Sequence, residues 1–262
     1  MIAVFVIAAV LLSALMAGAW CVQRFTDNSG WVDVVWSFGM GIAGLVLAVF
    51  PGPMTARRYV VAILIAAWAV RLGLHIAHRS LTGPEDARYA ALRQEWGTGF
   101  QRRLFVFLQI QALAAVLLSL SMMLAAHDPA PFPRVLDIAG ILVLVAAVVG
   151  EAVADAQLRR FRANPANKGK VCDAGLWGWS RHPNYFFEWL GWVAYPLLAI
   201  SSAWPWGWLA LSGPAFMYWL LVYVSGVPPL EQQMLKSRGD AFRAYQRRVS
   251  PFFPLPPKGS PS

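Results

Sequence analysis

Apolar runs long enough to cross a membrane recur along the whole chain. A transmembrane α-helix needs about 20 consecutive, mainly apolar residues. The seven runs of this kind are Ile2–Val22, Val32–Phe50, Tyr59–His75, Leu104–Ala125, Val135–Ala154, Tyr185–Ser201 and Trp206–Val227. The pattern predicts an all-α, polytopic membrane protein with seven transmembrane helices. No Lys or Arg precedes the first run, which favours a retained helix over a signal peptide.

The composition agrees with lipid as the main solvent of this chain. Hydrophobic residues make up 58% of the 262 residues and charged residues only 13%, whereas a soluble domain is about 25% charged. The chain also holds 13 Trp, a residue that is enriched at membrane–water boundaries. We expect one transmembrane domain over residues 1–262, ending in an extended, Pro-rich tail at residues 253–262.

The basic residues are unevenly divided between the two sides of the predicted membrane. Of the 22 Lys and Arg residues, 18 follow the first, third and fifth runs or lie in the C-terminal tail, and 3 lie on the opposite side. Cytoplasmic loops are rich in Lys and Arg. The N-terminus is therefore predicted to lie outside and the C-terminus in the cytoplasm. Because topology accounts for the net charge of +9, we expect no nucleic-acid partner.

Several ionisable residues interrupt the apolar runs, and each is costly inside a bilayer. Asp33 begins the second run, and Glu188 lies just inside the sixth. Helical spacing aligns further charges in two stripes, which are Arg71, His75, His78 and Arg79, and Glu151, Asp155, Arg159 and Arg162. These residues either pair with one another to hold helices together or border a polar cavity that opens to the cytoplasm. His75 and His78 lack an evident third ligand, so no metal site is expected.

The segment between the fifth and sixth runs concentrates groups that suit phosphate. Its cations are Arg159, Arg160, Arg162, Lys168 and Lys170, with Asn164 and Asn167 among them. Pro183 is placed to begin a helix, and Arg181, His182, Asn184 and Tyr185 surround that start, where backbone N–H groups favour an anion. We interpret the segment as a nucleotide-phosphate site, and an anchor on anionic lipid headgroups is the alternative. Trp177 and Trp179 offer faces for stacking or for interfacial anchoring.

The run G-L-W-G-W-S-R-H-P-N-Y-F-F-E, residues 175–188, resembles the signature of the membrane steroid 5α-reductase and sterol-reductase superfamily. Weaker similarity to its bacterial 5α-reductase-like branch (domain of unknown function 1295) extends over W-V-D-V-V-W, the segment His78–Tyr89, the D-x-x-x-R-x-x-R stripe and the tail. The resemblance implies a bacterial inner-membrane enzyme that uses NADPH to reduce the carbon–carbon double bond of an α,β-unsaturated ketone. Its substrate would be a steroid-like or other lipophilic molecule, reached from the cytoplasmic side.

The resemblance also assigns roles to residues of this chain. It implies that Asp155, Arg162, Arg181, His182, Asn184, Tyr185, Glu188 and Glu231 hold the cofactor. Together with the basic loop residues Arg79, Arg159, Asn164, Lys168 and Lys170, they form the predicted cofactor site. Asp33 and Tyr89 are the candidate proton donors. The chain departs from the steroid enzymes where they bind the substrate ketone, since Val34 follows Asp33 and Ile76 stands at a Tyr position.

Two other functions are consistent with parts of the sequence. Membrane methyltransferases that act on isoprenylcysteine or phospholipid use S-adenosylmethionine and share R-H-P-x-Y and a similar tail. They carry an acidic pair where this chain has Glu231 followed by Gln232. A lipid-binding or transport protein is the non-enzymatic alternative, although no internal repeat supports it. Membrane lipid and a lipophilic substrate are the expected partners, and we expect a monomer.

Overall fold

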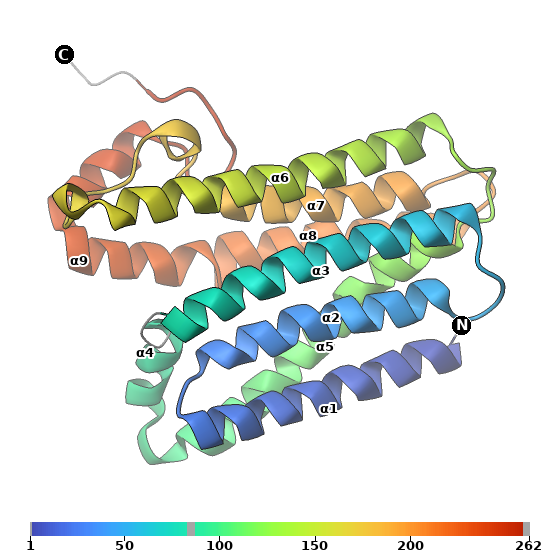
Figure 1. The fold of residues 1–262 in the computed structure, drawn as a ribbon, viewed down its shortest axis with the longest axis horizontal. Coiled ribbons are helices and arrows are strands. Elements are labelled where there is room, and N and C mark those ends of the chain that lie inside the picture. The colour runs from blue at the N-terminus through green and yellow to red at the C-terminus, as the bar shows by residue number, and fades with distance from the viewer. Residues whose placement is uncertain (1, 83–86, 259–262) are drawn as a thin grey trace. The chain divides into compact units, whose positions relative to one another are not determined.

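Helices dominate the computed structural model, which describes residues 2–82 and 87–258 (Figure 1). The α-helices are α1 (Ile2–Thr26), α2 (Gly30–Val49), α3 (Ala56–Thr82), α4 (Ala87–Trp96), α5 (Phe100–His127), α6 (Val135–Ala163), α7 (Pro183–Ala199), α8 (Ser212–Trp219) and α9 (Val227–Arg248). Short 3-10 segments are η1 (Gly97–Gly99), η2 (Pro165–Asn167), η3 (Gly175–Gly178) and η4 (Pro205–Leu211), and η5 (Leu220–Val224) is a π-helix. The described residues form no β-sheet, so the predicted all-α class is confirmed.

Six segments are long and apolar enough to cross a membrane. They are α1, α2, α3, α6, the stretch Arg88–His127 and the stretch Pro205–Arg248. The sixth predicted run forms α7, which has only 17 residues and contains Pro196. A helix of this length is about 25 Å long, somewhat less than the hydrocarbon thickness. The six segments support a multi-pass membrane protein, and the seventh span stays a prediction.

The chain divides into two compact units, and the boundary falls within helices. The first unit is Met1–Ile141 with Tyr195–Gly213, and the second is Leu142–Ala194 with Pro214–Ser262. In the first unit α1, α2 and α3 lie side by side, and α5 packs along α1 and α2 (Figure 1). Small residues allow this close packing, since a Cβ on Gly41 would lie 2.4 Å from the Cβ of Ala69 on α3.

A buried ion network closes one end of the first unit. Arg57 donates to Asp137 at 2.6 and 3.1 Å, and Arg134 lies 2.8 Å from both Asp137 and Asp128. The backbone carbonyl of Leu198 accepts hydrogen bonds from both guanidinium groups. Two positive and two negative charges balance, so the network satisfies charges that would otherwise be costly to bury. The sequence analysis assigned Arg57 and Arg134 only to the three basic residues on the side opposite the cytoplasm, and it did not predict this pairing.

In the second unit α6 and α7 run antiparallel and in close contact. A Cβ on Gly150 of α6 would lie 2.4 Å from the Phe187 ring, and one on Gly191 of α7 would lie 3.6 Å from the Cβ of Ala147. Aromatic side chains extend this core, and they are Phe186, Trp189, Tyr218, Phe252 and Phe253. Buried Phe252 anchors the chain that follows α9. The described residues of this segment, 249–258, contain no helix. Residues 259–262 of that tail lie outside the described residues.

Helix α9 is a folded-back pair of helices that the sequence analysis did not predict. Its backbone leaves helical geometry at Gly239, where φ is 51° and ψ is −123°. Residues 231 and 246 would be about 22 Å apart along a straight helix. Instead, the Gln246 amide donates a 2.8 Å hydrogen bond to Glu231. Met234 and Leu235 of the first half pack against Phe242 and Tyr245 of the second half, together with Val171 and Val249.

Candidate functional site

The predicted site residues divide between the two units. Asp33, Arg79 and Tyr89 belong to the first unit. The second unit contains the remaining predicted residues, which are Asp155, Arg159, Arg162, Asn164, Lys168, Lys170, Arg181, His182, Asn184, Tyr185, Glu188 and Glu231. The two groups are therefore described separately.

In the first unit both candidate proton donors belong to one polar cluster. The Tyr89 hydroxyl donates a 3.0 Å hydrogen bond to Asp33 Oδ1, and the Arg88 guanidinium donates to Asp33 Oδ2. The amide of Gln111 on α5 donates to the Tyr89 hydroxyl at 3.5 Å. Tyr89 is buried and lies on α4, so this short helix is fastened to the start of α2.

The bonds of this cluster distinguish the two candidate donors. Both Asp33 oxygens accept hydrogen bonds, and a carboxylate that only accepts has no proton to give. Tyr89 retains a hydroxyl proton and is positioned by Asp33. Gln111 Oε1 is buried and has no hydrogen-bond partner in the described part of the chain, so the cluster still offers an acceptor. Arg79 lies exposed near the end of α3, and residues 83–86 of the motif His78–Tyr89 lie outside the described residues.

In the second unit the tryptophan-rich motif forms a tight loop against α6. Gly175 has a φ of +60°, and a Cβ on Gly178 would lie 2.8 Å from the carbonyl oxygen of Asp173, which explains the two glycines. The buried Trp177 indole donates a 3.0 Å hydrogen bond to the Ala154 carbonyl. Trp177 is thus buried as a structural anchor, which differs from both predicted roles, a stacking face and an interfacial anchor. Trp179 remains half exposed.

Arg181 joins the start of α7 to both halves of α9. Its Nε donates to Glu231 Oε1 at 2.7 Å, and its Nη2 donates to Oε2 at 3.3 Å. Its Nη1 donates to the carbonyls of Gln246 and Val249 at 3.1 and 2.7 Å. Most of its donors are therefore used by protein acceptors that stabilise the fold-back of α9.

His182 completes this cluster beside the predicted helix start, and α7 does begin at Pro183. The Nε2 atom of the buried ring lies 3.1 Å from Glu231 Oε1. Burial lowers the pKa of His182, and the hydrogen bond to Glu231 opposes this shift. Among the described residues Nδ1 has no hydrogen-bond partner. Tyr185 stacks on the imidazole, with 5.6 Å between ring centroids.

Buried carboxylates lie along the contact between α6 and α7. Asp155 Oδ1 accepts a 3.5 Å hydrogen bond from Asn184, and Glu188 accepts a 3.1 Å bond from the Trp192 indole. Glu151, one turn before Asp155, is also buried. This row contributes polar acceptors to the second unit.

The basic segment after α6 lines a cavity of about 360 Å³. Its polar lining consists of cations and amides, which are Arg162, Lys168, Lys170, Arg238, Asn164 and Asn167. Leu158, Phe161 and Met234 supply an apolar wall, and no acidic side chain lines the cavity in the described part of the structure. Arg159 and Arg160 are exposed and do not line it. The cavity therefore suits an anion that carries a flat or apolar group.

Sequence reasoning missed the contribution of α9 to this cavity. Met234 and Arg238 reach it because they precede the fold-back at Gly239. The pattern V-P-P-L-E, with Pro at the first helical positions, was a usable signal for the start of α9. Cys172 also lines the cavity, and burial raises the pKa of its thiol.

Comparison with known proteins identifies one family. No curated protein and no solved structure matches the chain. Residues 19–249, which contain every predicted site residue, match the model of a family described as a protein of unknown function, DUF1295. The chain therefore belongs to the DUF1295 family.

Proposed function

We propose that this protein is a membrane-embedded, NADPH-dependent reductase of an α,β-unsaturated ketone in a lipophilic, sterol-like substrate. The observation that carries the proposal is the basic cavity of the second unit. Four cations line it without an acidic residue, and NADPH is a ligand with several phosphate groups. Arg and Lys side chains bind phosphate through charge-assisted hydrogen bonds.

The same cavity argues against the methyltransferase alternative. S-adenosylmethionine carries a sulfonium, an ammonium and one carboxylate group, so its net charge is positive, and it has no phosphate. A lining of Arg162, Lys168, Lys170 and Arg238 would therefore disfavour it. NADPH would instead place phosphate near these cations and a flat base near Phe161 and Leu158. The extra phosphate of NADPH favours it over NADH for the same electrostatic reason.

The Tyr89 hydroxyl is the proposed proton donor. When bound, NADPH would supply a hydride for the β-carbon of the enone. As negative charge develops on the ketone oxygen, the Tyr89 hydroxyl would shift its proton from the hydrogen bond with Asp33 to that oxygen. The enol that forms would tautomerise to the saturated ketone, and water would return a proton to Tyr89. Asp33 and Arg88 hold the Tyr89 side chain in place. Hydrogen bonds that strengthen as the oxyanion forms lower the barrier.

The proposal includes a membrane topology. With α7 as a short span in addition to the six longer segments, seven helices cross the membrane. The excess of Lys and Arg supports a location of the C-terminus and the basic cavity at the cytoplasmic side of a bacterial inner membrane. NADPH is available on that side.

Thermal unfolding of the full chain in detergent tests the proposal directly. A ligand at 100 times its Kd stabilises a protein by about 2.7 kcal/mol. We expect NADPH to raise the unfolding temperature, NADH to raise it less, and S-adenosylmethionine to leave it unchanged. The double variant Lys168→Gln/Lys170→Gln should lose most of the NADPH effect. Lys236→Gln is the matched control, because Lys236 is exposed and does not line the cavity.

Other outcomes would reassign the protein. Stabilisation by S-adenosylmethionine alone would support the methyltransferase. If no nucleotide stabilises the protein, the lipid-binding alternative gains support. An equal loss of the NADPH effect in Lys236→Gln would attribute binding to general surface charge rather than to the cavity.

A further inference from the structure

A second cavity lies in the first unit, at the turn between α4 and α5. Gly97 has a φ of +49°, which lets the chain reverse after Trp96. The Trp96 indole returns against α5, where its ring centroid lies 6.2 Å from that of Phe107. The resulting groove has a volume of about 550 Å³ and is lined by Trp96, Gly99, Arg102, Arg103, Val106, Phe107 and Ile110. This volume is within the usual range for small-molecule sites.

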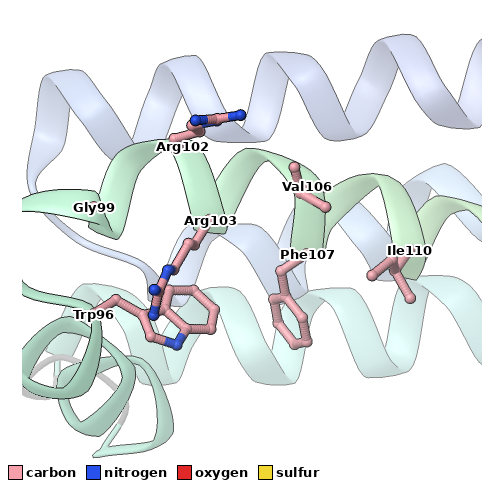
Figure 2. Close-up of a pocket in the computed structure, with 7 residues that line it drawn as sticks. All are labelled: Trp96, Gly99, Arg102, Arg103, Val106, Phe107 and Ile110. Atoms are coloured by element: carbon pink, nitrogen blue, oxygen red, sulfur yellow. The ribbon is translucent and has the colours of Figure 1, made fainter.

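The groove is basic at one end and apolar at the other. Arg102 and Arg103 lie in the first turn of α5, and the apolar lining follows over the next two turns, about 10 Å further along the axis. Figure 2 shows Arg103 and Phe107 projecting from the same side of α5 as the Trp96 ring. Val106 and Ile110 are 53% and 59% exposed within a segment apolar enough to span a membrane.

The charges at the basic end are available to a ligand. Neither Arg102 nor Arg103 forms an ion pair with any residue in the described ranges 2–82 and 87–258, and the groove has no acidic lining there. By contrast, nearby Arg93 is paired with Asp27 at 2.6 Å. Figure 2 shows Arg103 projecting on the Trp96 side of α5 and Arg102 projecting from the other side. The Arg103 guanidinium can donate bidentate hydrogen bonds to a phosphate, and Arg102 adds a second positive charge at the same end of the groove.

The order of these groups selects one class of ligand. A free phosphate would occupy the basic end and leave Val106, Phe107 and Ile110 uncovered. A neutral lipid would cover the apolar wall and leave two cations without an anion. A Trp such as Trp96 is typical of the membrane–water boundary, where a phospholipid places its phosphate above its acyl chains.

We propose that this groove is a specific site for one anionic phospholipid. Its phosphate binds Arg103, Arg102 adds positive charge at the same end of the groove, and an acyl chain covers Val106, Phe107 and Ile110. Trp96 forms the side wall that separates this site from the surrounding bilayer. The site does not depend on the reductase chemistry proposed above.

Native mass spectrometry of the full chain tests this site. The protein is purified in a mild detergent and mixed with equal amounts of phosphatidylglycerol and phosphatidylcholine that carry the same acyl chains. The wild type should retain one phosphatidylglycerol in preference. Loss of a charge-assisted hydrogen bond weakens binding about tenfold or more, so Arg103→Gln should weaken retention by at least about that factor, and Arg102→Gln should weaken it less.

Two further variants separate the groove from general surface charge. Arg24→Gln is the matched control, because Arg24 is also exposed, lies 5.3 Å from the Trp20 ring and lines no part of the groove. Ile110→Trp should fill the apolar end of the groove and abolish lipid retention while keeping both charges. Because Ile110 is exposed, this substitution should not unfold the protein. Equal retention of the two lipids, an equal loss in Arg24→Gln, or displacement of the lipid by inorganic phosphate alone would overturn the proposal.

Discussion

The Tyr89 hydroxyl donates a 3.0 Å hydrogen bond to Asp33, which precedes it by 56 residues. Tyr89 lies on α4, a helix of 10 residues, and Asp33 lies in the first turn of α2. Isolated helices shorter than about 12 residues are marginal in water. The contact therefore orders α4 and also places a phenol beside a carboxylate, an arrangement that suits proton donation.

Removing the Tyr89 hydroxyl should impair the proposed chemistry without impairing cofactor binding. Tyr89→Phe keeps the ring in its buried position and removes the proton, and general acid catalysis contributes about 10²–10⁴-fold in rate. We expect the turnover of an enone substrate, followed by NADPH oxidation, to fall within that range. The stabilisation by NADPH should persist. Tyr59→Phe is the control, because Tyr59 is exposed, and it should retain full turnover.

Neutralising one carboxylate of the buried ion network should destabilise the first unit strongly. Asp137→Asn leaves the network with two cations and one anion. Breaking a buried pair costs about 3–5 kcal/mol because one charge stays buried without compensation. The expected result is a large drop in unfolding temperature in detergent.

A double variant tests whether charge balance is the reason. Arg57→Met/Asp137→Asn leaves Arg134 paired with Asp128, so the double variant should be more stable than Asp137→Asn alone. Asp240→Asn removes an exposed partner of Arg243 and should leave the unfolding temperature unchanged. If the double variant is less stable than Asp137→Asn, charge imbalance is not the cause.

The stability of the second unit should fall as the solution becomes acidic because His182 is buried. Burial lowers its pKa in the folded protein, whereas the unfolded imidazole takes up a proton near pH 6.5. The unfolded state therefore binds more protons below about pH 6.5. Stability is lost as the pH falls from there toward the folded pKa, by up to about 1.4 kcal/mol per pH unit. His182→Gln should flatten the dependence of unfolding temperature on pH between about 7.5 and 5.5, and an unchanged slope would contradict this account.

Gly239 should be essential to the fold-back of α9 for reasons of backbone conformation alone. Its φ of 51° and ψ of −123° are strained for other residues, yet a Cβ there would meet no atom within 4 Å. Gly239→Ala should therefore lower the stability by about 1–3 kcal/mol. Gly18 is matched, since its Cβ would also meet no atom but its backbone is helical, so Gly18→Ala should be neutral or stabilising. Equal effects in thermal unfolding would exclude the backbone explanation.

The apolar pattern was sufficient to predict most long helices but not the polar α9. Runs such as Ile2–Val22 and Leu104–Ala125 are apolar over their whole length, both where side chains pack in the core and where they face lipid. Hydrophobicity alone therefore reveals them. Helix α9 depends instead on a few long-range contacts, such as Tyr245 with Met234 and Arg181 with Glu231. A fold-back at one glycine cannot be recognised from hydropathy, because it requires a backbone conformation rather than a composition.

The candidate site shows the same division between local and long-range information. The basic residues Arg162, Lys168 and Lys170 are close in sequence, and their shared cavity was predictable from their spacing. Spacing did not reveal that Arg238 joins them. It also did not reveal that Arg181 and Glu231, both predicted to hold the cofactor, are bonded to each other. Partners that lie 50 residues apart are chosen by the tertiary fold.

Arg181 also imposes an order on biosynthesis. Its acceptors are Glu231, Gln246 and Val249, all of which leave the ribosome long after the guanidinium itself. Until Glu231 has been synthesised, this cation has only water or lipid headgroups as partners, and the contacts with Gln246 and Val249 follow later still. The last stretch of translation therefore completes the second unit. A stop codon placed directly after Val227 would leave the seven predicted apolar runs intact but would remove the contacts that Arg181 makes with α9.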